Sequence, residues 1–427
     1  MACLPPEGAG SRRPREPGHH RRTVMTAART ALVIGGGVAG AAAAIALTRA
    51  GIEVRVVEAH DRTDRDHGSF LTLATNGIDA LRAIEADGRV LEAGFPTAAM
   101  TLRSHTGKRL GTTSTGGVLA DGTVSQTVRR ADLVRALRAE VETRGIEIRY
   151  GRRLVGLDAG PARVRAEFDD GSVAEADLLV GADGIHSTVR RLALPGSPEP
   201  AYSGLVTTGG YAPGLTLDSP PGDYEMIFGK RAFFGFAVAP GEQAWWFVNL
   251  PHRREPARGE LAAVGDAQWR ARFAELYADD AGPALEIIAA TPDFAPMTAI
   301  QTIPRLRPWS SGRVIVIGDA AHAPSPTSGQ GASLAVEDAV VLAMSLRDRD
   351  SVEQAYAQFE TLRRPRVEAI IRAAARINNN KAPGAVGRLV RDAVLPRILA
   401  SAMARNSADQ ASDHHLDWAA GVSEGSR

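Results

Sequence analysis

The most specific chemical signal in the sequence is a glycine-rich turn followed by an acidic residue about 20 positions later. Gly35, Gly37 and Gly40 form the pattern GxGxxG, and Glu58 is the acid. The first glycine of such a turn permits a tight bend, the second lets the backbone approach a pyrophosphate, and the third lets a helix pack on a strand. The carboxylate accepts hydrogen bonds from ribose hydroxyls. These residues predict a dinucleotide site with an unphosphorylated ribose, as in FAD or NAD.

The elements that must position this turn occur in the right order. Residues 31–34 form a short apolar run typical of a buried strand, residues 38–50 an alanine-rich helix, and residues 53–57 a second strand. Val38 and Ala39 open the helix, whose N-terminus offers N–H groups and a partial positive charge to the phosphates. No second glycine fingerprint follows a predicted strand, so one tightly held dinucleotide is favoured over two separate sites.

Two aspartates stand beside glycines at the ends of other apolar runs. Asp183-Gly184, the DG pair, and Gly318-Asp319, the GD pair, each follow a short run that predicts a strand. Open α/β sheets bind their ligands at the carboxyl ends of strands. Either pair alone is equally compatible with a simple turn or a helix N-cap.

Together and in this order, the GxGxxG turn, the DG pair and the GD pair resemble the group A flavoprotein monooxygenases. These are FAD-dependent aromatic hydroxylases with a fold like that of para-hydroxybenzoate hydroxylase. The resemblance runs from about Ala31 to Ala400. It implies that the glycine turn binds the ADP half of FAD and that the GD pair holds the ribityl chain. It also implies that the DG pair is associated with both FAD and the nicotinamide cofactor.

The segment after the GD pair strengthens this resemblance. Gly329 and Gly331 precede a predicted helix that begins near Ala332. Its N-terminus would direct a positive dipole at the pyrimidine edge of the flavin, where the family places backbone N–H groups near the flavin O2 atom. Pro326 matches a family proline beside the reacting flavin carbon. The chain departs from many relatives at Ala59, where they have an arginine, so one cofactor contact is missing or moved to a nearby arginine.

Several charged residues are interpreted through the same resemblance or through their surroundings. The family places a cofactor-contacting arginine just before a helix, which maps best to Arg130; the alternative is a solvated basic turn. Arg190 stands at the matching place after the DG pair, with the same alternative. Glu337 and Asp338 are expected to pair with the dipole in the first turn of their helix rather than to take part in catalysis. His322 is expected to be structural.

The fold class predicted by these motifs is α/β, with a Rossmann-like FAD-binding domain interleaved with an antiparallel-sheet substrate domain and followed by C-terminal helices. Within the middle segment, Trp245 and Trp246 are expected to pack in the sheet, which in the family covers the flavin and forms much of the substrate pocket. The predicted segments are a disordered extension (1–24), a first FAD-binding part with a short substrate-domain insertion near 70–110 (25–195), the substrate sheet (196–300), a second FAD-binding part (301–345), C-terminal helices (346–406) and a frayed tail (407–427).

The composition excludes several classes of function. Lys and Arg number 50 and Asp and Glu 49, and this near-neutral balance argues against a dedicated nucleic-acid binder. The single cysteine, Cys3, can form neither an internal disulfide nor a thiolate metal cluster, so redox chemistry must come from a bound cofactor and no metal site is expected. The uncharged stretch Thr30–Thr48 is too rich in Ala and Gly for an export signal or a membrane span. A cytoplasmic monomer or homodimer is expected.

These features predict a FAD-dependent monooxygenase that uses NADH or NADPH and O2. The resemblance implies that the reduced flavin forms a hydroperoxyflavin, whose distal oxygen hydroxylates or epoxidises an electron-rich ring. No cluster of Arg or Lys in residues 196–300 marks a site for a small carboxylate or phosphate, so a largely apolar aromatic or polycyclic substrate is expected, phenolic or indolic and of the natural-product type. No catalytic base is singled out. The alternatives are a flavin-dependent dehydrogenase or reductase on the same fold, a flavin halogenase and a non-enzymatic FAD-binding scaffold; the halogenase is disfavoured because its WxWxIP signature is missing.

Overall fold

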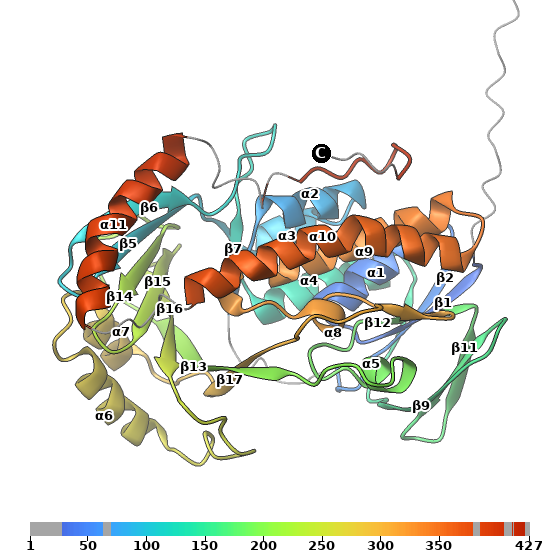
Figure 1. The fold of residues 1–427 in the computed structure, drawn as a ribbon, viewed down its shortest axis with the longest axis horizontal. Coiled ribbons are helices and arrows are strands. Elements are labelled where there is room, and N and C mark those ends of the chain that lie inside the picture. The colour runs from blue at the N-terminus through green and yellow to red at the C-terminus, as the bar shows by residue number, and fades with distance from the viewer. Residues whose placement is uncertain (1–27, 63–69, 379–384, 405–411, 413, 423–427) are drawn as a thin grey trace, which may run out of the picture.

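The computed structural model describes residues 28–62, 70–378, 385–404, 412 and 414–422. The predicted disordered extension lies outside these residues. The predicted α/β architecture is confirmed: a mainly parallel six-stranded sheet and a mainly antiparallel seven-stranded sheet occupy opposite ends of the molecule (Figure 1). Two three-stranded sheets complete the β structure of the described part.

The six-stranded sheet has the order β18-β19-β12-β1-β2-β8. Its strands are β1 (Thr30–Ile34), β2 (Glu53–Val57), β8 (Glu147–Arg149), β12 (Leu178–Gly181), β18 (Ser310–Ser311) and β19 (Val314–Val316). Every neighbouring pair is parallel except β18 with β19. β12 and β19 are buried throughout, which explains their continuous apolar runs. Because β19, β12 and β1 are adjacent and parallel, their carboxyl ends meet at one edge.

The seven-stranded sheet has the order β17-β13-β16-β15-β14-β5-β6. Its strands are β5 (Ala99–Ser104), β6 (Arg109–Ser114), β13 (Ala201–Ala212), β14 (Tyr224–Phe228), β15 (Phe233–Ala239), β16 (Gln243–Pro251) and β17 (Thr298–Thr302). The pairing is antiparallel except between β14 and β5. One face packs with α6 (Asp266–Tyr277) and α7 (Ala284–Ala290) in a core of their own. The sheet therefore combines the predicted middle segment with two strands from much earlier in the chain.

A three-stranded sheet connects the two halves. It consists of β3 (Phe70–Leu73), β7 (Gln126–Arg129) and β4 (Phe95–Pro96), in the order β3-β7-β4. Side chains alternate between the two faces of a strand. Leu73 and Val128 accordingly pack in the core of the six-stranded sheet, while Phe70 packs against aromatic residues of the seven-stranded sheet. One small sheet thus contacts both halves.

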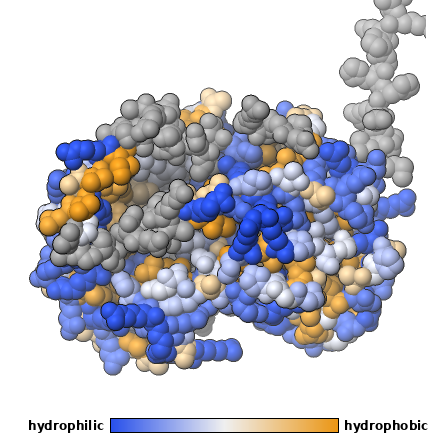
Figure 2. Space-filling model, in the orientation of Figure 1, coloured by the Kyte–Doolittle hydropathy of each residue, from blue (hydrophilic) through white to orange (hydrophobic). Residues whose placement is uncertain are grey.

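The remaining helices lie mainly around the six-stranded sheet, except α11, which packs on the seven-stranded sheet. They are α1 (Val38–Arg49), α2 (Thr75–Ala83), α3 (Gly88–Ala93), α4 (Arg130–Thr143), α5 (Thr188–Ala193), α8 (Asp319–His322), α9 (Gly331–Asp348), α10 (Val352–Asn378) and α11 (Ala385–Ala404). α9 packs against α1, α2 and α10. β9 (Leu154–Ala159), β10 (Val164–Phe168) and β11 (Val173–Ala176) form the remaining sheet. α11 packs on β6, and Figure 2 shows an apolar strip on its outward side, where Leu389, Val390 and Ile398 are exposed.

Residues 414–422 pack against the helices, so the prediction of a frayed tail (407–427) is wrong for this described part. Leu416 is buried and donates its backbone N–H to Asp79 of α2 (2.8 Å). The Trp418 ring lies under the guanidinium groups of Arg49 and Arg347, at 5.2 and 5.0 Å. Residues 414–422 therefore join α2 to α1 and α9. No local pattern in this polar segment predicts these contacts.

Candidate functional site

Each glycine of the GxGxxG turn meets a different steric demand. Gly35 has a φ of +101°, and a Cβ there would lie 2.5 Å from the carbonyl oxygen of Ala182. A Cβ on Gly40 would lie 1.8 Å from the carbonyl oxygen of Gly35, so α1 could not approach β1. At Gly37, by contrast, no described atom lies within 4 Å of an added Cβ. The first and third glycines are required by packing, and the second leaves space at the start of α1.

The start of α1 and the end of β2 offer complementary groups. No side chain in the described residues caps the N-terminus of α1, and its first turn holds no acidic residue. Its free N–H groups therefore suit a pyrophosphate. Glu58 is buried and accepts hydrogen bonds from the backbone N–H groups of Gly36 (2.7 Å) and His60 (2.9 Å) and from Nη2 of Arg138 (3.3 Å). A carboxylate has about four acceptor positions, so one remains for a ribose hydroxyl, and the donor set fits the adenosine half of FAD.

The DG and GD pairs lie at the same edge as the glycine turn. Ala182, next to the DG pair, donates its backbone N–H to the carbonyl oxygen of Ile34 (2.8 Å), at the end of β1. Gly318 has a φ of +57° and lies between two helices: a Cβ there would be 3.1 Å from Cβ of Ala39 in α1 and 3.2 Å from Cβ of Ala335 in α9. The structure thus brings together three motifs that are far apart in the sequence.

Asp183 of the DG pair also has a structural role. Its Oδ2 atom accepts hydrogen bonds from the backbone N–H groups of Thr188 (2.7 Å) and Val189 (3.1 Å), at the start of α5. Burial raises the pKa of Asp183, although these hydrogen bonds act in the opposite direction. Gly184 adopts a φ of +77°, which places it in the left-handed region. The pair shapes the loop between β12 and α5.

Arg190 is fully buried, so the alternative of a solvated basic turn does not hold for it. Its Nη1 donates to the carbonyl oxygen of Ala320 (2.8 Å) and its Nη2 to that of Ile185 (2.7 Å). Its Nε is buried without a hydrogen-bond partner among the described residues. Burial lowers the pKa of this guanidinium. Arg190 therefore ties the loop of the DG pair to α8, which follows the GD pair.

The segment from the GD pair to α9 is open for ligand contacts. The Asp319 carboxylate, half-buried at the start of α8, accepts no hydrogen bond from the described residues. Pro326 is exposed and begins a single 3₁₀ turn, and Gly329 follows with a φ of +60°. α9 begins at Gly331 with no capping side chain in the described structure and no acid in its first turn; Ala332 there is half-buried. The 18-residue α9 thus presents free N–H groups toward this loop.

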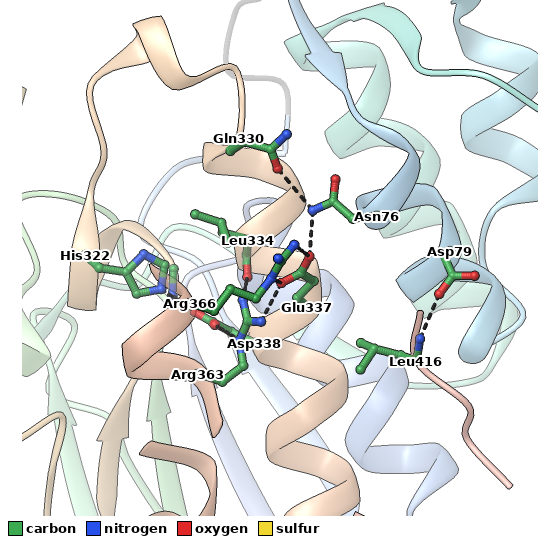
Figure 3. Close-up of polar contacts among 11 residues, drawn as sticks. Asn76, Asp79, His322, Gln330, Leu334, Glu337, Asp338, Arg363, Arg366 and Leu416 are labelled. Atoms are coloured by element: carbon green, nitrogen blue, oxygen red, sulfur yellow. Dashed lines mark hydrogen bonds and ion pairs between the residues drawn. The ribbon is translucent and has the colours of Figure 1, made fainter. Parts of the chain in front are cut away.

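Glu337 and Asp338 form the centre of a buried charge network (Figure 3). The expectation that they pair with the dipole in the first turn of the helix is wrong, because α9 begins at Gly331 and both carboxylates are fully buried. Arg363 of α10 donates Nε to Asp338 (2.8 Å) and pairs with Glu337 through Nη1. Arg366 donates Nη2 to Glu337 (2.7 Å). Two carboxylates and two guanidinium groups neutralise each other between α9 and α10.

The network extends in two directions toward the candidate site. On one side, Asn76 of α2 donates Nδ2 to Glu337 (2.6 Å) and to Gln330 (3.0 Å), the residue before α9 (Figure 3). On the other side, Oδ2 of Asp338 accepts a hydrogen bond from the backbone N–H of Gly318 (3.0 Å) and lies 2.5 Å from Nε2 of His322. The network thus fixes both the start of α9 and the GD pair, and these contacts support a structural role for His322.

The pKa values of both carboxyls stay low despite their burial. Burial acts to raise the pKa of Glu337, but the charges of Arg363 and Arg366 outweigh it and hold that pKa at about 2. For Asp338, burial is likewise outweighed by His322 and Arg363, and the pKa is again about 2. Both groups are ionised at neutral pH, so they serve as fixed anchors rather than proton carriers.

The arginines around α4 differ in their contacts. Arg130 is the first residue of α4 and is exposed; its side chain forms no hydrogen bond or ion pair with a described residue. Arg129 points toward the seven-stranded sheet, with its guanidinium carbon 4.5 Å from the ring centroid of Tyr211. Arg138 contacts the glycine turn, because its Nε donates to the carbonyl oxygen of Gly36 (2.7 Å). Arg138 is therefore a cofactor-site candidate that the sequence analysis missed.

Aromatic side chains gather where the three-stranded and seven-stranded sheets face each other. We call Phe70, Phe95, Tyr211, Tyr224, Trp245 and Phe247 the aromatic cluster. The ring centroid of Phe70 lies 5.6 Å from that of Trp245 and 6.3 Å from that of Tyr224. Trp245 belongs to this cluster, whereas Trp246 points to the opposite face and packs under α6. The two tryptophans therefore have different surroundings although they are adjacent in the sequence.

The strand β3 connects the aromatic cluster to the start of α9. Phe70 begins β3, and Ala74, just beyond the end of β3, donates its backbone N–H to Oγ of Ser333 in α9 (3.1 Å). Gly77 of α2 approaches the same residue so closely that a Cβ would lie 2.7 Å from Oγ of Ser333. A surface pocket of about 340 Å³, lined by residues 193–198, 305–308, 310 and 311, contains none of the motif residues.

Comparisons with known proteins identify the family. Residues 28–374 match the FAD binding domain family. Aurachin C monooxygenase/isomerase from Stigmatella aurantiaca is 29% identical over 351 residues, which cover 82% of this chain and 88% of that protein. The 2-heptyl-3-hydroxy-4(1H)-quinolone synthase of Pseudomonas aeruginosa strain UCBPP-PA14 is 32% identical over 320 residues, 74% of this chain and 80% of that protein. The structure of Klebsiella pneumoniae HpxO with FAD and uric acid matches with a TM-score of 0.77 and 25% identity, covering 90% of this chain and 97% of that one.

The chain belongs to the group A FAD-dependent aromatic hydroxylases. The predicted family, fold class, cofactor and enzyme class are thereby confirmed: the hydroxylase is a FAD-dependent monooxygenase of the kind that acts on aromatic substrates, with NAD(P)H as the co-substrate typical of the family. The alternative of a dehydrogenase without oxygen transfer is not favoured. Within the described ranges, no helix of the hydroxylase is both long and apolar enough to cross a bilayer.

Two signals in the sequence could have pointed to the buried network of the hydroxylase. Asn76-Gly77 places a glycine in the first turn of α2, and such a glycine often marks a close approach of another element. The acidic pair Glu337-Asp338 also has a basic complement in residues 363–366 of the next helix. The ion pairs between these acidic and basic residues depend on the packing of α9 against α10, which the sequence does not show.

Proposed function

We propose that the hydroxylase uses NAD(P)H and dioxygen to hydroxylate or epoxidise a planar, largely apolar aromatic ring bound at the aromatic cluster. The observation that carries this proposal is the position of β3. Phe70, at one end of β3, is at the centre of the aromatic cluster, and Ala74, beyond the other end, binds Ser333 in the first turn of α9. A ring on the cluster therefore lies near the helix N-terminus that would receive the flavin.

The proposed FAD site uses the three motifs. The start of α1 binds the pyrophosphate, Glu58 the ribose and Asp319 the ribityl chain, while the start of α9 meets the pyrimidine edge. The remaining proposed contacts are Arg130, the DG pair and Pro326, the last beside the reacting carbon. The full proposed set is Gly35, Gly37, Val38, Ala39, Gly40, Glu58, Arg130, Asp183, Gly184, Gly318, Asp319, Pro326, Gly329, Gly331 and Ala332. When bound, FAD would supply the redox chemistry, in which two electrons from NAD(P)H reduce dioxygen so that one oxygen atom enters the ring and the other leaves as water.

The protein orients the substrate, excludes water from the reacting atoms and supplies a fixed hydrogen-bonding group. The rings of the aromatic cluster hold a planar substrate by offset and edge contacts, and their apolar surfaces keep water from the reacting atoms. The hydroxyl oxygen of Tyr224 accepts hydrogen bonds from Thr72 (3.0 Å) and Thr127 (3.1 Å). Burial raises the pKa of Tyr224, so at neutral pH it keeps a proton to donate to an oxygen of the ring.

The names of the relatives support a substrate whose aromatic ring carries an oxygen atom. One relative is named for a 4(1H)-quinolone, and the matched structure contains uric acid; both compounds are planar oxo-heteroaromatics. The aromatic cluster offers the apolar surface that such a ring needs. A reaction that consumes NAD(P)H also fits the expected cytoplasmic location.

The test is a screen of ring classes with the purified holoenzyme. We expect phenolic, indolic and quinolone compounds to accelerate NAD(P)H oxidation, and mass spectrometry to find label from isotopic dioxygen in the product. Accelerated oxidation without label in any product would favour a dehydrogenase or reductase instead. A response to simple benzoates alone would contradict the proposed substrate class.

A further inference from the structure

Arg129 lies on the face of the three-stranded sheet that carries the aromatic cluster. It is the last residue of β7 and stands directly opposite Phe70 of β3. Residues directly opposite in an antiparallel pair project to the same face. Thr72 and Thr127, two residues farther along these strands, project to the same side and both bind the hydroxyl of Tyr224. The Arg129 side chain is therefore directed at the proposed substrate site.

The guanidinium of Arg129 has aromatic partners but no counter-charge among the described residues. Its carbon lies 4.5 Å from the ring centroid of Tyr211 and 5.2 Å from that of Trp245. Its Nη2 donates to Oε1 of Gln243 (3.1 Å). Its Nε is buried and has no hydrogen-bond partner in the described structure, and no described carboxylate forms an ion pair with it. An arginine carries five N–H donors, and within the described part of the chain only the Nη2 contact with Gln243 uses one of them.

Other arginines that are drawn into the protein are satisfied differently. Arg363 meets Glu337 and Asp338, and Arg190 donates both of its Nη groups to carbonyl oxygens although its Nε, like that of Arg129, has no partner among the described residues. A partly buried charge without a counter-charge is unfavourable unless something completes it. The aromatic rings under Arg129 hold its plane in place by cation–π contacts, which leaves its donor edge available.

We propose that Arg129 binds an anionic oxygen on the aromatic substrate of the hydroxylase. This inference rests on the proposed function, since it assumes that the aromatic cluster holds the ring. The oxygen belongs to a carboxylate or to an ionised ring hydroxyl, which present the same acceptor to a planar guanidinium. Arg129 thus selects rings with one negatively charged edge and an otherwise apolar surface. It comes from β7, outside the 196–300 segment that supplies most of the sheet.

The experiment compares shape-matched anionic and neutral probes on the FAD-loaded enzyme. One pair is 2-naphthoate and 2-naphthamide; the other is 4-hydroxycoumarin, ionised at neutral pH, and 4-methoxycoumarin. Binding is read from quenching of tryptophan fluorescence and from the visible spectrum of bound FAD, without turnover. We expect one anion to bind about 10- to 100-fold more tightly than its neutral partner. A preference in the first pair identifies a carboxylate, and in the second an ionised hydroxyl.

Three variants assign the preference to Arg129. Arg129→Met should remove it, and Arg129→Lys should keep part of it. Gln243→Glu places a carboxylate beside the guanidinium without changing the side chain's shape, so it should also remove the preference. This variant replaces Arg129→Met as the test if Arg129→Met does not fold. Arg135→Gln alters an exposed arginine on the neighbouring helix that pairs with Asp132 and should leave the preference unchanged.

Three results would overturn the proposal. One is an equal affinity of the wild-type enzyme for each anion and its neutral partner, or no binding of any probe. Another is an unchanged anion preference in both Arg129→Met and Gln243→Glu. The third is a higher KM for NADPH in Arg129→Met with the probe preference intact, which would assign the arginine to the nucleotide. An anion preference that depends on Arg129, combined with no oxygen incorporation for any ring, would instead leave Arg129 as an anion site and refute the proposed function.

Discussion

Arg363 and Arg129 are both withdrawn from bulk water, yet their electrical surroundings are opposite. Arg363 is 1% exposed and contacts two buried carboxylates, whereas Arg129 contacts two aromatic rings and an amide. In the network of Arg363 each charge has its counter-charge, so the network can fix the start of α9 and the GD pair. Arg129 has no such partner among the described residues. A buried arginine whose charge is balanced by carboxylates holds its neighbours rigidly, whereas an arginine without a carboxylate partner can bind an anionic ligand.

The same contrast separates the half that carries the proposed FAD site from the half that carries the proposed substrate site. We call them the cofactor half and the substrate half. The cofactor half relies on backbone: positive φ angles at Gly35 and Gly318, close helix–strand contact at Gly40, and free helix N-termini. The substrate half relies on side chains contributed by β3, β4, β7, β13, β14 and β16. Mutations should therefore act differently in the two regions.

The largest effect is expected from Gly40→Ala. The added methyl group would overlap the carbonyl oxygen of Gly35 at 1.8 Å, so α1 must move away from β1. The protein should purify without FAD or fail to fold, as measured by the flavin absorbance per protein and by thermal unfolding. Gly37→Ala should fold but hold FAD more weakly, because its Cβ enters the open space at the start of α1. Gly88→Ala, at another open Cβ position, is the control. Normal FAD content in Gly40→Ala would contradict this account.

Arg363→Met should destabilise the protein strongly, and Arg129→Met should not. Removing Arg363 leaves Glu337 and Asp338 buried without their main partner, which costs about 3–5 kcal/mol. Removing Arg129 leaves no described charge unpaired, so the expected loss is under about 1 kcal/mol. Denaturant unfolding of the holoenzyme measures both. Arg372→Gln, which breaks an exposed ion pair with Glu368, should change the stability by less than about 1 kcal/mol. Equal losses in the two Met variants would remove the distinction between the regions.

The buried carboxylates predict a loss of stability in acid. Their folded pKa values of about 2 lie below the ordinary values of 4.5 for Glu337 and 3.8 for Asp338. The unfolded chain therefore takes up protons first as the pH falls. The stabilisation is fully present above about pH 4.5 and is lost toward pH 2, on the order of a few kcal/mol. Unfolding free energies measured across this range should fall more steeply for the wild type than for Glu337→Gln. Parallel slopes would show that these groups do not govern the effect.

Adjacent tryptophans provide the smallest and most local comparison. Trp246 is fully buried, and its Nε1 donates to Oγ1 of Thr291 (2.8 Å), so Trp246→Phe should cost about 1–3 kcal/mol through lost packing and a lost hydrogen bond. Trp245→Phe should change stability less but raise the KM for the ring substrate, because Trp245 belongs to the aromatic cluster. Thermal unfolding and steady-state kinetics distinguish the two. A pure stability effect at Trp245 would exclude it from the substrate site.

Much of the cofactor half could be predicted because its signals are local. The strand–turn–helix around Gly35, Gly37 and Gly40 depends on neighbours within a few residues, and the apolar runs before the DG and GD pairs reveal buried strands. The interpretation of Glu337 and Asp338 failed for the opposite reason. Their partners, Arg363 and Arg366, lie in the next helix of the chain. The packing of α9 against α10 therefore decides whether the two acids face solvent or these arginines.

The sequence by itself determined the family, the FAD-binding fold and the place of the glycine turn, because backbone conformation and strand burial depend on short stretches of chain. Only the tertiary structure decided the electrical character of the proposed substrate site. Arg129 lies outside the 196–300 segment that supplies most of the seven-stranded sheet, yet the pairing of β7 with β3 carries it to the rings of Tyr211 and Trp245. Contacts between strands so far apart depend on how the sheets pack, and no local pattern encodes that packing.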